Sequence, residues 1–168
     1  MFVSIRRGVT VAAVLAFTGV ASADPAPPRP VISDLVLRDP GGARVLEVDV
    51  PGLPDTAMAE MTRLGPMILY NPELYRAAGP AREFVRAHEY AHVILSHLEE
   101  PRYFGSDEGH SEAEAEADCF AAKHASSLSV MAMVRLLRRR PPEPRDAIYG
   151  TKAQRARRIL ACAGMPQG

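Results

Sequence analysis

The residues best suited to chemistry are two histidines four positions apart, His88 and His92, with Glu89 directly after the first. Positions i and i+4 of a helix share one face, so the two imidazoles can converge on one metal ion. Glu89 lies about 100° further around the helix, where its carboxylate can reach a water bound to that ion. The pattern His-Glu-x-x-His is therefore typical of a catalytic zinc site in which the glutamate is the general base.

The segment that carries these residues is mostly apolar, which predicts a buried helix. Its apolar side chains are Phe84, Ala87, Ala91, Val93, Ile94 and Leu95. Buried imidazoles and carboxylates need partners, and a metal ion is one of the partners that can satisfy them. The alternative is an ordinary polar network among core residues, without a metal.

An alanine-rich stretch from His110 to Ala122 predicts a second helix with several acidic residues. Glu114 and Asp118 stand at i and i+4 and share a face bordered by small alanines, which allows a close approach to the first helix. We therefore expect Glu114 to be the third metal ligand and Asp118 to accept the second N–H of a ligand histidine, His88.

Other roles for these acidic residues stay open. Ser111 and Glu114 also fit a capping box, in which Glu114 would bond to the backbone at the start of the helix. Glu112 and Glu116 are alternative ligands, but neither has an aspartate four residues later. The acidic residues could also form an ordinary solvated face.

The two motifs together resemble the His-Glu-x-x-His and Glu-x-x-x-Asp signature of gluzincin metallopeptidases, which include thermolysin-like and HtpX-like enzymes. Glu-Ala-Asp followed by Phe-Ala-Ala, from Glu116 to Ala122, is most similar to the HtpX-like branch and small exported proteins related to it. The resemblance spans about residues 81–123 and implies a zincin-like fold that hydrolyses peptide bonds. By this resemblance the zinc ligands are His88, His92 and Glu114, the general base is Glu89, and Asp118 supports the ligands from behind.

The sequence departs from these families at several points. HtpX-like proteins are embedded in membranes, whereas no spanning segment follows the leader of this chain, and Ala113 stands where thermolysin-like enzymes have asparagine before the third ligand. His97 follows His92 too closely, and without an intervening glycine, to match the third histidine of a metzincin. We interpret His97 as a polar residue at the helix end. The oxyanion-stabilising residue has no motif, and the candidates by type are His110, His124 and Tyr149.

The chain begins with a predicted signal peptide, residues 1–23. Arg6 and Arg7 precede an apolar run of about a dozen residues, which is short of the roughly 20 that a membrane anchor requires, and Ala21-Ser22-Ala23 fits a cleavage site. Residues 24–30 form a proline-rich flexible leader. We expect an exported protein, periplasmic or extracellular and of bacterial origin, with no stable membrane anchor after cleavage.

The sequence contains two cysteines, Cys119 and Cys162. An even number of cysteines in an exported domain favours a disulfide, here one that ties the second active-site helix to the C-terminal helix. Two buried free thiols are the alternative.

Residues 31–168 are expected to form one α+β domain. Strands at 31–37 and 43–50 form a hairpin, a helix covers 55–64, and a strand at about 67–71 lies beside the metal helix, where it offers an open edge to an extended substrate. The metal helix runs over about 81–98, and two further helical segments end the chain. The expected architecture is a small mixed or antiparallel sheet packed on the two active-site helices.

The sequence therefore predicts an exported zinc-dependent endopeptidase with one zinc ion per chain and a peptide or protein as substrate. With 20 basic and 20 acidic side chains, the charge gives no reason to expect a nucleic-acid partner. The alternatives are a catalytically silent zinc-binding module of the cell envelope and an exported structural protein without metal.

Overall fold

The computed structural model describes residues 36–103, 106–139 and 150–166. The expected signal peptide and proline-rich leader lie outside the described residues, as does most of the strand expected at 31–37. Among the described helices, none combines the length and apolar character that crossing a membrane requires.

Three short strands form one mixed sheet. The strands are β1 (Leu46–Asp49), β2 (Ala57–Thr62) and β3 (Gly65–Tyr70), in the order β1-β3-β2. The central strand β3 pairs in parallel with β1 and antiparallel with β2. The side chains of Ile68 and Tyr70 on β3 are buried, so this strand carries much of the contact between the sheet and the core.

The prediction of a helix over residues 55–64 is wrong, because most of this segment forms strand β2. Its apolar residues happened to follow a helical spacing, but the segment is short, and Gly65 adopts a positive φ of 106° that turns the chain directly back into β3. Thr62 Oγ1 donates a hydrogen bond to the carbonyl of Gly65 within this turn. Antiparallel pairing along the whole of β2 then decides the conformation.

Of the hairpin expected around Asp39–Gly42, the described residues show the turn and one pairing beside it. Arg38 and Arg44 form a single antiparallel bridge on its two sides. After this bridge, β1 pairs with β3 in parallel. The buried side chains of Leu37 and Val45 attach the turn to the core.

Helices make up most of the rest of the described chain. Their bounds are α1 Pro72–Ala77, η2 Gly79–Ala81, α2 Arg82–Ile94, η3 Pro101–Tyr103, α3 Asp107–His124, α4 Ser127–Arg139 and α5 Lys152–Cys162. Thr151 is the N-cap of α5, and its side chain forms a capping box with Gln154. The expected α+β class is confirmed: one domain with a small mixed sheet and a helical C-terminal half.

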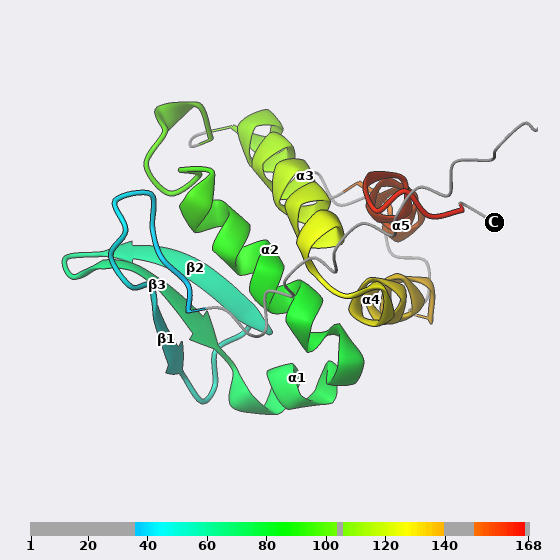
Figure 1. The fold of residues 1–168 in the computed structure, drawn as a ribbon, viewed down its shortest axis with the longest axis horizontal. Coiled ribbons are helices and arrows are strands. Elements are labelled where there is room, and N and C mark those ends of the chain that lie inside the picture. The colour runs from blue at the N-terminus through cyan, green and yellow to red at the C-terminus, as the bar shows by residue number, and fades with distance from the viewer. Residues whose placement is uncertain (1–35, 104–105, 140–149, 167–168) are drawn as a thin grey trace, which may run out of the picture.

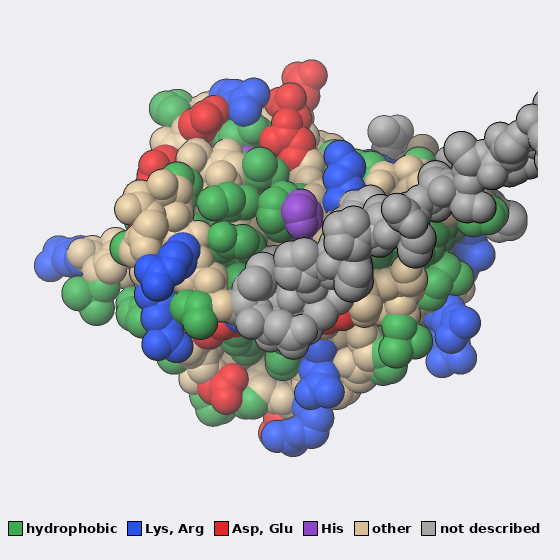
Figure 2. All heavy atoms as spheres, in the orientation of Figure 1, with side chains coloured by type: hydrophobic (Ala, Val, Ile, Leu, Met, Phe, Trp, Pro, Cys, Tyr) green, Lys and Arg blue, Asp and Glu red, His purple; other side chains and the backbone are tan. Residues whose placement is uncertain are grey.

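The helices form successive layers beside the sheet (Figure 1). Helix α2 packs against β2 and β3, α3 packs against the other side of α2, and α5 packs against both α3 and α4. The expectation that both active-site helices pack on the sheet is therefore corrected, since α2 lies between the sheet and α3. Figure 2 shows hydrophobic side chains near the centre of one face of the domain, beside a histidine, with charged side chains mainly towards its outline.

Small side chains line the contact between α2 and α3. The alanines at this contact and around it are all buried: Ala87, Ala91, Ala113, Ala117 and Ala121. Alanine adds little bulk beyond the backbone and has the highest helix propensity, so the two helices can approach closely without weakening either one. This approach brings a carboxylate of α3 to the histidines of α2.

Both ends of α2 are fixed by local contacts. At its start, the backbone N–H of Phe84 donates to Ser129 Oγ at 2.8 Å, and Glu83 accepts from the backbone N–H of Ser126 at 2.9 Å. At its end, Ser96 has a φ of 58°, which is unusual for a residue other than glycine and reverses the chain after Ile94. The helix therefore stops four residues before the expected end at residue 98.

Candidate metal centre

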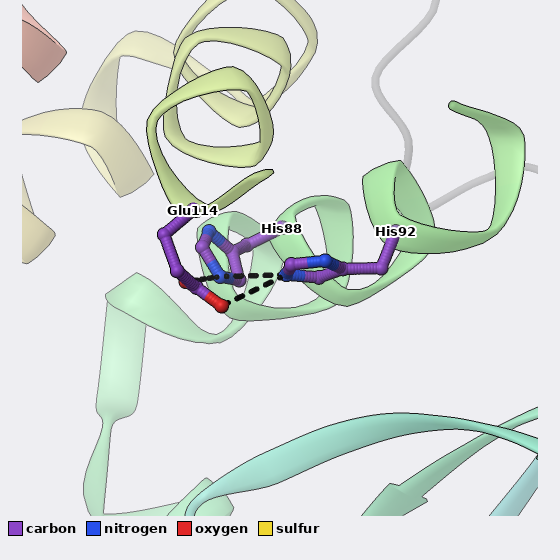
Figure 3. Close-up of side chains that lie close together, drawn as sticks. All are labelled: His88, His92 and Glu114. Carbon is purple, nitrogen blue, oxygen red and sulfur yellow. Dashed lines mark hydrogen bonds and ion pairs between the residues drawn. The ribbon is translucent and has the colours of Figure 1, made fainter. Parts of the chain in front are cut away.

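Three donor groups from two helices meet at one point. The Nε2 atom of His88 lies 2.9 Å from Oε2 of Glu114, and Nε2 of His92 lies 3.4 Å from Oε1 of the same carboxylate. The two Nε2 atoms lie 3.3 Å apart. Figure 3 shows the two imidazoles of α2 and the carboxylate of α3 pointing toward one another.

This arrangement suits a metal ion better than it suits a set of hydrogen bonds. One ligand atom from each of the three side chains lies within 4.8 Å of the others, which is close enough for one ion to bind all three. The buried Oε2 of Glu114 has no hydrogen-bond partner of good geometry within the described part of the chain, and its contact with Nε2 of His88 at 2.9 Å is an ion pair. Two imidazole nitrogens and one carboxylate oxygen are also the donor set of many catalytic zinc sites. The group can therefore hold a metal ion.

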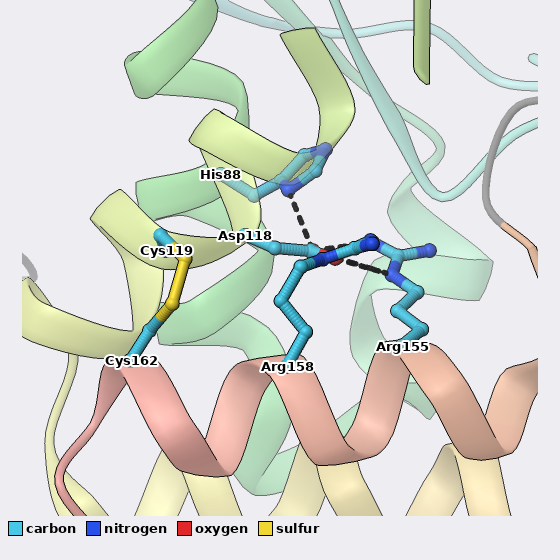
Figure 4. The surroundings of a disulfide bond; sticks show 6 residues. All are labelled: His88, Asp118, Cys119, Arg155, Arg158 and Cys162. Carbon is cyan, nitrogen blue, oxygen red and sulfur yellow. Dashed lines mark hydrogen bonds and ion pairs between the residues drawn. A yellow bond between two sulfur atoms is a disulfide. The ribbon is translucent and has the colours of Figure 1, made fainter. Parts of the chain in front are cut away.

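Asp118 supports His88 from the side opposite Glu114. Its Oδ1 lies 3.2 Å from Nδ1 of His88, and the aspartate is completely buried. Arg155 reaches both carboxylate oxygens, at 2.8 and 2.9 Å, and Arg158 reaches Oδ2 at 3.0 Å. The aspartate expected to support His88 thus lies beside it, and two guanidinium groups neutralise its charge (Figure 4).

The sequence reasoning missed both arginines, although a signal was present. Arg155, Arg158 and Cys162 are spaced by three and four residues, which places them on one face of α5. Cys119 directly follows Asp118, and it pairs with Cys162 at disulfide distance, with the two Cα atoms 5.1 Å apart. The expected disulfide therefore turns the arginine face of α5 toward Asp118.

The capping role considered for Glu114 is excluded by the start of α3. This helix begins at Asp107 rather than His110, and Ser106 is its N-cap, with its side chain accepting from the backbone N–H of Gly109. Glu114 consequently lies two turns inside the helix. Of the alternative ligands, Glu112 is exposed and Glu116 faces a different histidine.

His97 is not a polar residue at the end of a helix, as the sequence suggested. Because the chain reverses at Ser96, the His97 side chain folds back and is buried beside His92, with the two Nδ1 atoms 3.1 Å apart. Its Nε2 lies 3.0 Å from Oε2 of Glu116. Nothing in the sequence indicated this, since serine rarely adopts the left-handed conformation.

A cleft of about 750 Å³ opens onto the three donor groups. Of the oxyanion candidates chosen by type, His110 and His124 are exposed and do not line the cleft, and Tyr149 lies outside the described residues. The cationic side chains that do line the cleft are Lys152 and Arg155. Both are further candidates, beside the untested Tyr149, for stabilising negative charge on a bound molecule.

The charges of the donor groups are strongly coupled. Burial opposes protonation of His88, but its contacts with Asp118 and Glu114 outweigh burial and raise its pKa to about 10. Burial and the neighbouring positive charge of His88 lower the pKa of His92 to about 3. Although burial opposes its ionisation, His88 lowers the pKa of Glu114 to about 2. In the metal-free protein, His88 is therefore the protonated member of the group.

Glu89 is buried beside the donor groups and lines the same cleft. Burial raises its pKa to about 7; the charge of His88 opposes this rise, and the carboxylate of Glu114 adds to it. A carboxylate with a pKa near 7 exchanges protons readily at neutral pH, which is the property of an effective general base or acid.

No family model, no curated protein and no solved structure matches this chain. The interpretation of the centre consequently rests on its own geometry and chemistry.

We predict that Glu114→Ala reduces metal affinity by more than the roughly 10- to 100-fold loss typical for a residue that only supports a ligand. The substitution removes one of the three donors, and no other acidic side chain belongs to the group among the described residues. Competition with a chelating dye measures the affinity. Glu112→Ala, on an exposed position of the same helix, is the matched control, and equal losses in both variants would contradict the assignment.

We also predict that metal binding releases about one proton per ion at neutral pH, because His88 must lose the proton that its raised pKa retains. Apparent affinity should therefore rise with pH in the range below about 10. Calorimetric titration with zinc in buffers of different ionisation enthalpy gives the number of protons. The same titration of Glu89→Gln shows how many of the released protons come from Glu89. If neither protein released protons on binding zinc, the prediction would be contradicted.

The disulfide should stabilise the domain, because it closes a loop with a sequence separation of 43 residues. Reduction is expected to lower the free energy of unfolding by about 2–4 kcal/mol. Denaturant titration with and without reductant measures this change. The double variant Cys119→Ser/Cys162→Ser is the control, since reductant should not affect it, and two free thiols in the denatured, unreduced wild type would contradict the pairing.

Proposed function

We propose that this chain is an exported zinc-dependent endopeptidase of the gluzincin type. The observation that carries the proposal is the position of Glu89, a buried carboxylate that lines the same cleft as the three donor groups without belonging to them. A site that only stabilises the fold has no use for such a group, since structural zinc sites are closed by four protein ligands. Three donors, an open cleft and an adjacent base favour catalysis.

Zinc is the metal that best fits the donors. His88, His92 and Glu114 supply two nitrogens and one oxygen, the set found in gluzincins, and no thiolate lies among them. A bound zinc ion would polarise the carbonyl of the scissile peptide bond and lower the pKa of a water molecule at the site. Glu89 would accept a proton from the attacking water as the water oxygen bonds to the carbonyl carbon, and would pass that proton to the amine nitrogen as the C–N bond breaks.

The cleft has the features needed to hold an extended peptide. Its wall includes residues 56–59, which belong to β2 and the residue before it, and within the described chain β2 pairs only with β3 and leaves its other edge open. An extended substrate can add to such an edge through backbone hydrogen bonds. This corrects the expected substrate edge, because β3 is paired on both sides and β2 takes that role.

The opposite wall supplies apolar contacts and positive charge. Helices α1, α2 and α4 contribute apolar side chains to the cleft, namely Leu74, Val85, Met133, Leu136 and Leu137. Lys152 and Arg155, at the start of α5, add positive charge beside them. This combination favours peptides with a bulky apolar side chain near the scissile bond, and the cations suit the negative charge that develops on its carbonyl oxygen.

Export is supported by two features of the chain. A disulfide between Cys119 and Cys162 is stable in an oxidising compartment, and the first 23 residues have the composition of a secretory signal. The substrate of such an enzyme is a peptide or protein of the cell envelope or the surrounding medium.

Glu89→Gln should abolish turnover while leaving metal binding intact. The amide has nearly the same shape as the carboxylate but cannot accept a proton at neutral pH, so we expect a loss of at least about 100-fold in kcat, within the range for general-base catalysis. Zinc content per chain and cleavage of unfolded casein would be measured on the same preparations.

Glu112→Gln is the control, because Glu112 is an exposed glutamate of α3 that does not line the cleft. Zinc in the wild type without cleavage of any unfolded substrate would favour the silent zinc-binding module. Equal cleavage by wild type and Glu89→Gln would contradict the proposed role of Glu89 as general base. An absence of zinc from the purified protein would refute the whole proposal.

A further inference from the structure

A row of polar side chains continues from His92 away from the cleft. Nδ1 of His92 lies 3.1 Å from Nδ1 of His97, and Nε2 of His97 lies 3.0 Å from Oε2 of Glu116. The hydroxyl of Tyr103 donates to the same Oε2 at 2.9 Å. The row thus links the end of α2, the turn after it, η3 and the middle of α3.

When His97 is neutral, one assignment of protons satisfies every contact in this row. Oε2 of Glu116 accepts from Tyr103 and requires a second donor, which is the Nε2–H of His97. A neutral His97 with its proton on Nε2 has a lone pair on Nδ1, so its partner at 3.1 Å must be the Nδ1–H of His92. His92 in turn has its lone pair on Nε2, the atom that faces Glu114 and His88.

We propose that His97 is a positioning residue for the metal centre: oriented by Glu116 and Tyr103, it fixes His92 in the tautomer and ring orientation that direct Nε2 to the metal. The inference rests on the metal-binding part of the proposed function and is independent of peptide hydrolysis. His97 does not touch the metal, since it lies outside the group of residues whose ligand atoms converge.

The surroundings of His97 hold its ring in place. The residue is 3% exposed, and its ring packs against that of Tyr103 with centroids 4.5 Å apart. The left-handed backbone at Ser96 brings His97 back toward α2, where the backbone N–H of His97 also donates to the carbonyl of His92 at 3.0 Å. The unusual backbone conformation of Ser96 therefore places His97 in contact with His92, and strained residues of this kind are common at functional sites.

The support of His92 differs from that of His88. His88 is backed by the carboxylate of Asp118, whereas His92 is backed by an imidazole that transmits the orientation set by Glu116. Residues that hold a ligand histidine from behind commonly change metal affinity when they are replaced, although they never touch the metal. Loss of His97 should therefore weaken binding through His92 alone.

The first experiment reads the tautomers in the wild type without metal. Nitrogen-15 NMR of histidine side chains is expected to show the proton of His92 on Nδ1 and that of His97 on Nε2. A proton on Nε2 of His92 would overturn the proposal. The NMR result does not depend on metal uptake. A protein that bound no zinc would refute the proposed function, but its NMR spectrum would still show which nitrogen of His92 donates to His97.

The second experiment compares metal affinity and stability in matched variants. His97→Phe keeps a buried ring but removes the acceptor, and we expect zinc affinity to fall about 10- to 100-fold. His97→Asn places an amide oxygen close to the position of Nδ1 and should restore part of the affinity. His110→Phe, at an exposed histidine, is the control and should bind zinc as the wild type does.

The cobalt-substituted proteins provide a readout of geometry that does not depend on turnover. The visible spectrum of bound cobalt should differ from that of the wild type in His97→Phe and return toward it in His97→Asn. Unchanged zinc affinity and an unchanged cobalt spectrum in a folded His97→Phe protein would overturn the proposal. So would a His97→Phe protein whose only defect is a lower thermal stability without metal, because that result indicates a purely structural role.

Discussion

The close contact between α2 and α3 is the constraint on which the centre depends. His88 and His92 belong to α2, but the third donor, Glu114, belongs to α3, and it reaches them only because alanines line the contact. A larger side chain at Ala113 or Ala117 would separate the helices and withdraw the carboxylate, since packed interiors cannot absorb the added volume without displacement. Packing and ligand geometry are therefore set by the same residues.

The same contact creates an electrostatic problem that the C-terminal helix solves. Asp118 is completely buried, and an unpaired carboxylate in that position would destabilise the fold strongly. Arg155 and Arg158 on α5 neutralise it, and the cysteine pair joins α5 to α3 one residue after the aspartate. The C-terminal helix is thus part of the centre, although it contributes no ligand.

The sequence predicted those features that depend on local spacing. The convergence of His88, His92 and Glu114, the cysteine pairing and the class of fold all follow from residues placed at helical intervals or from an even cysteine count. It failed at β2, where tertiary pairing outweighed a helical pattern, and at His97, because the reversal at Ser96 has no signature in composition. Contacts set by long-range pairing or by a strained residue need the folded structure.

The two histidines of the candidate centre are held by different contacts. His88 contacts Asp118 of α3, which is fixed by two arginines of α5 and the cysteine pair, whereas His92 contacts His97 just after α2 and, through it, Glu116 of α3. The contact of His92 with His97 follows the left-handed turn at Ser96 and, unlike the contact of His88 with Asp118, has no disulfide beside it, so a metal ion that binds both histidines would depend on this less constrained contact.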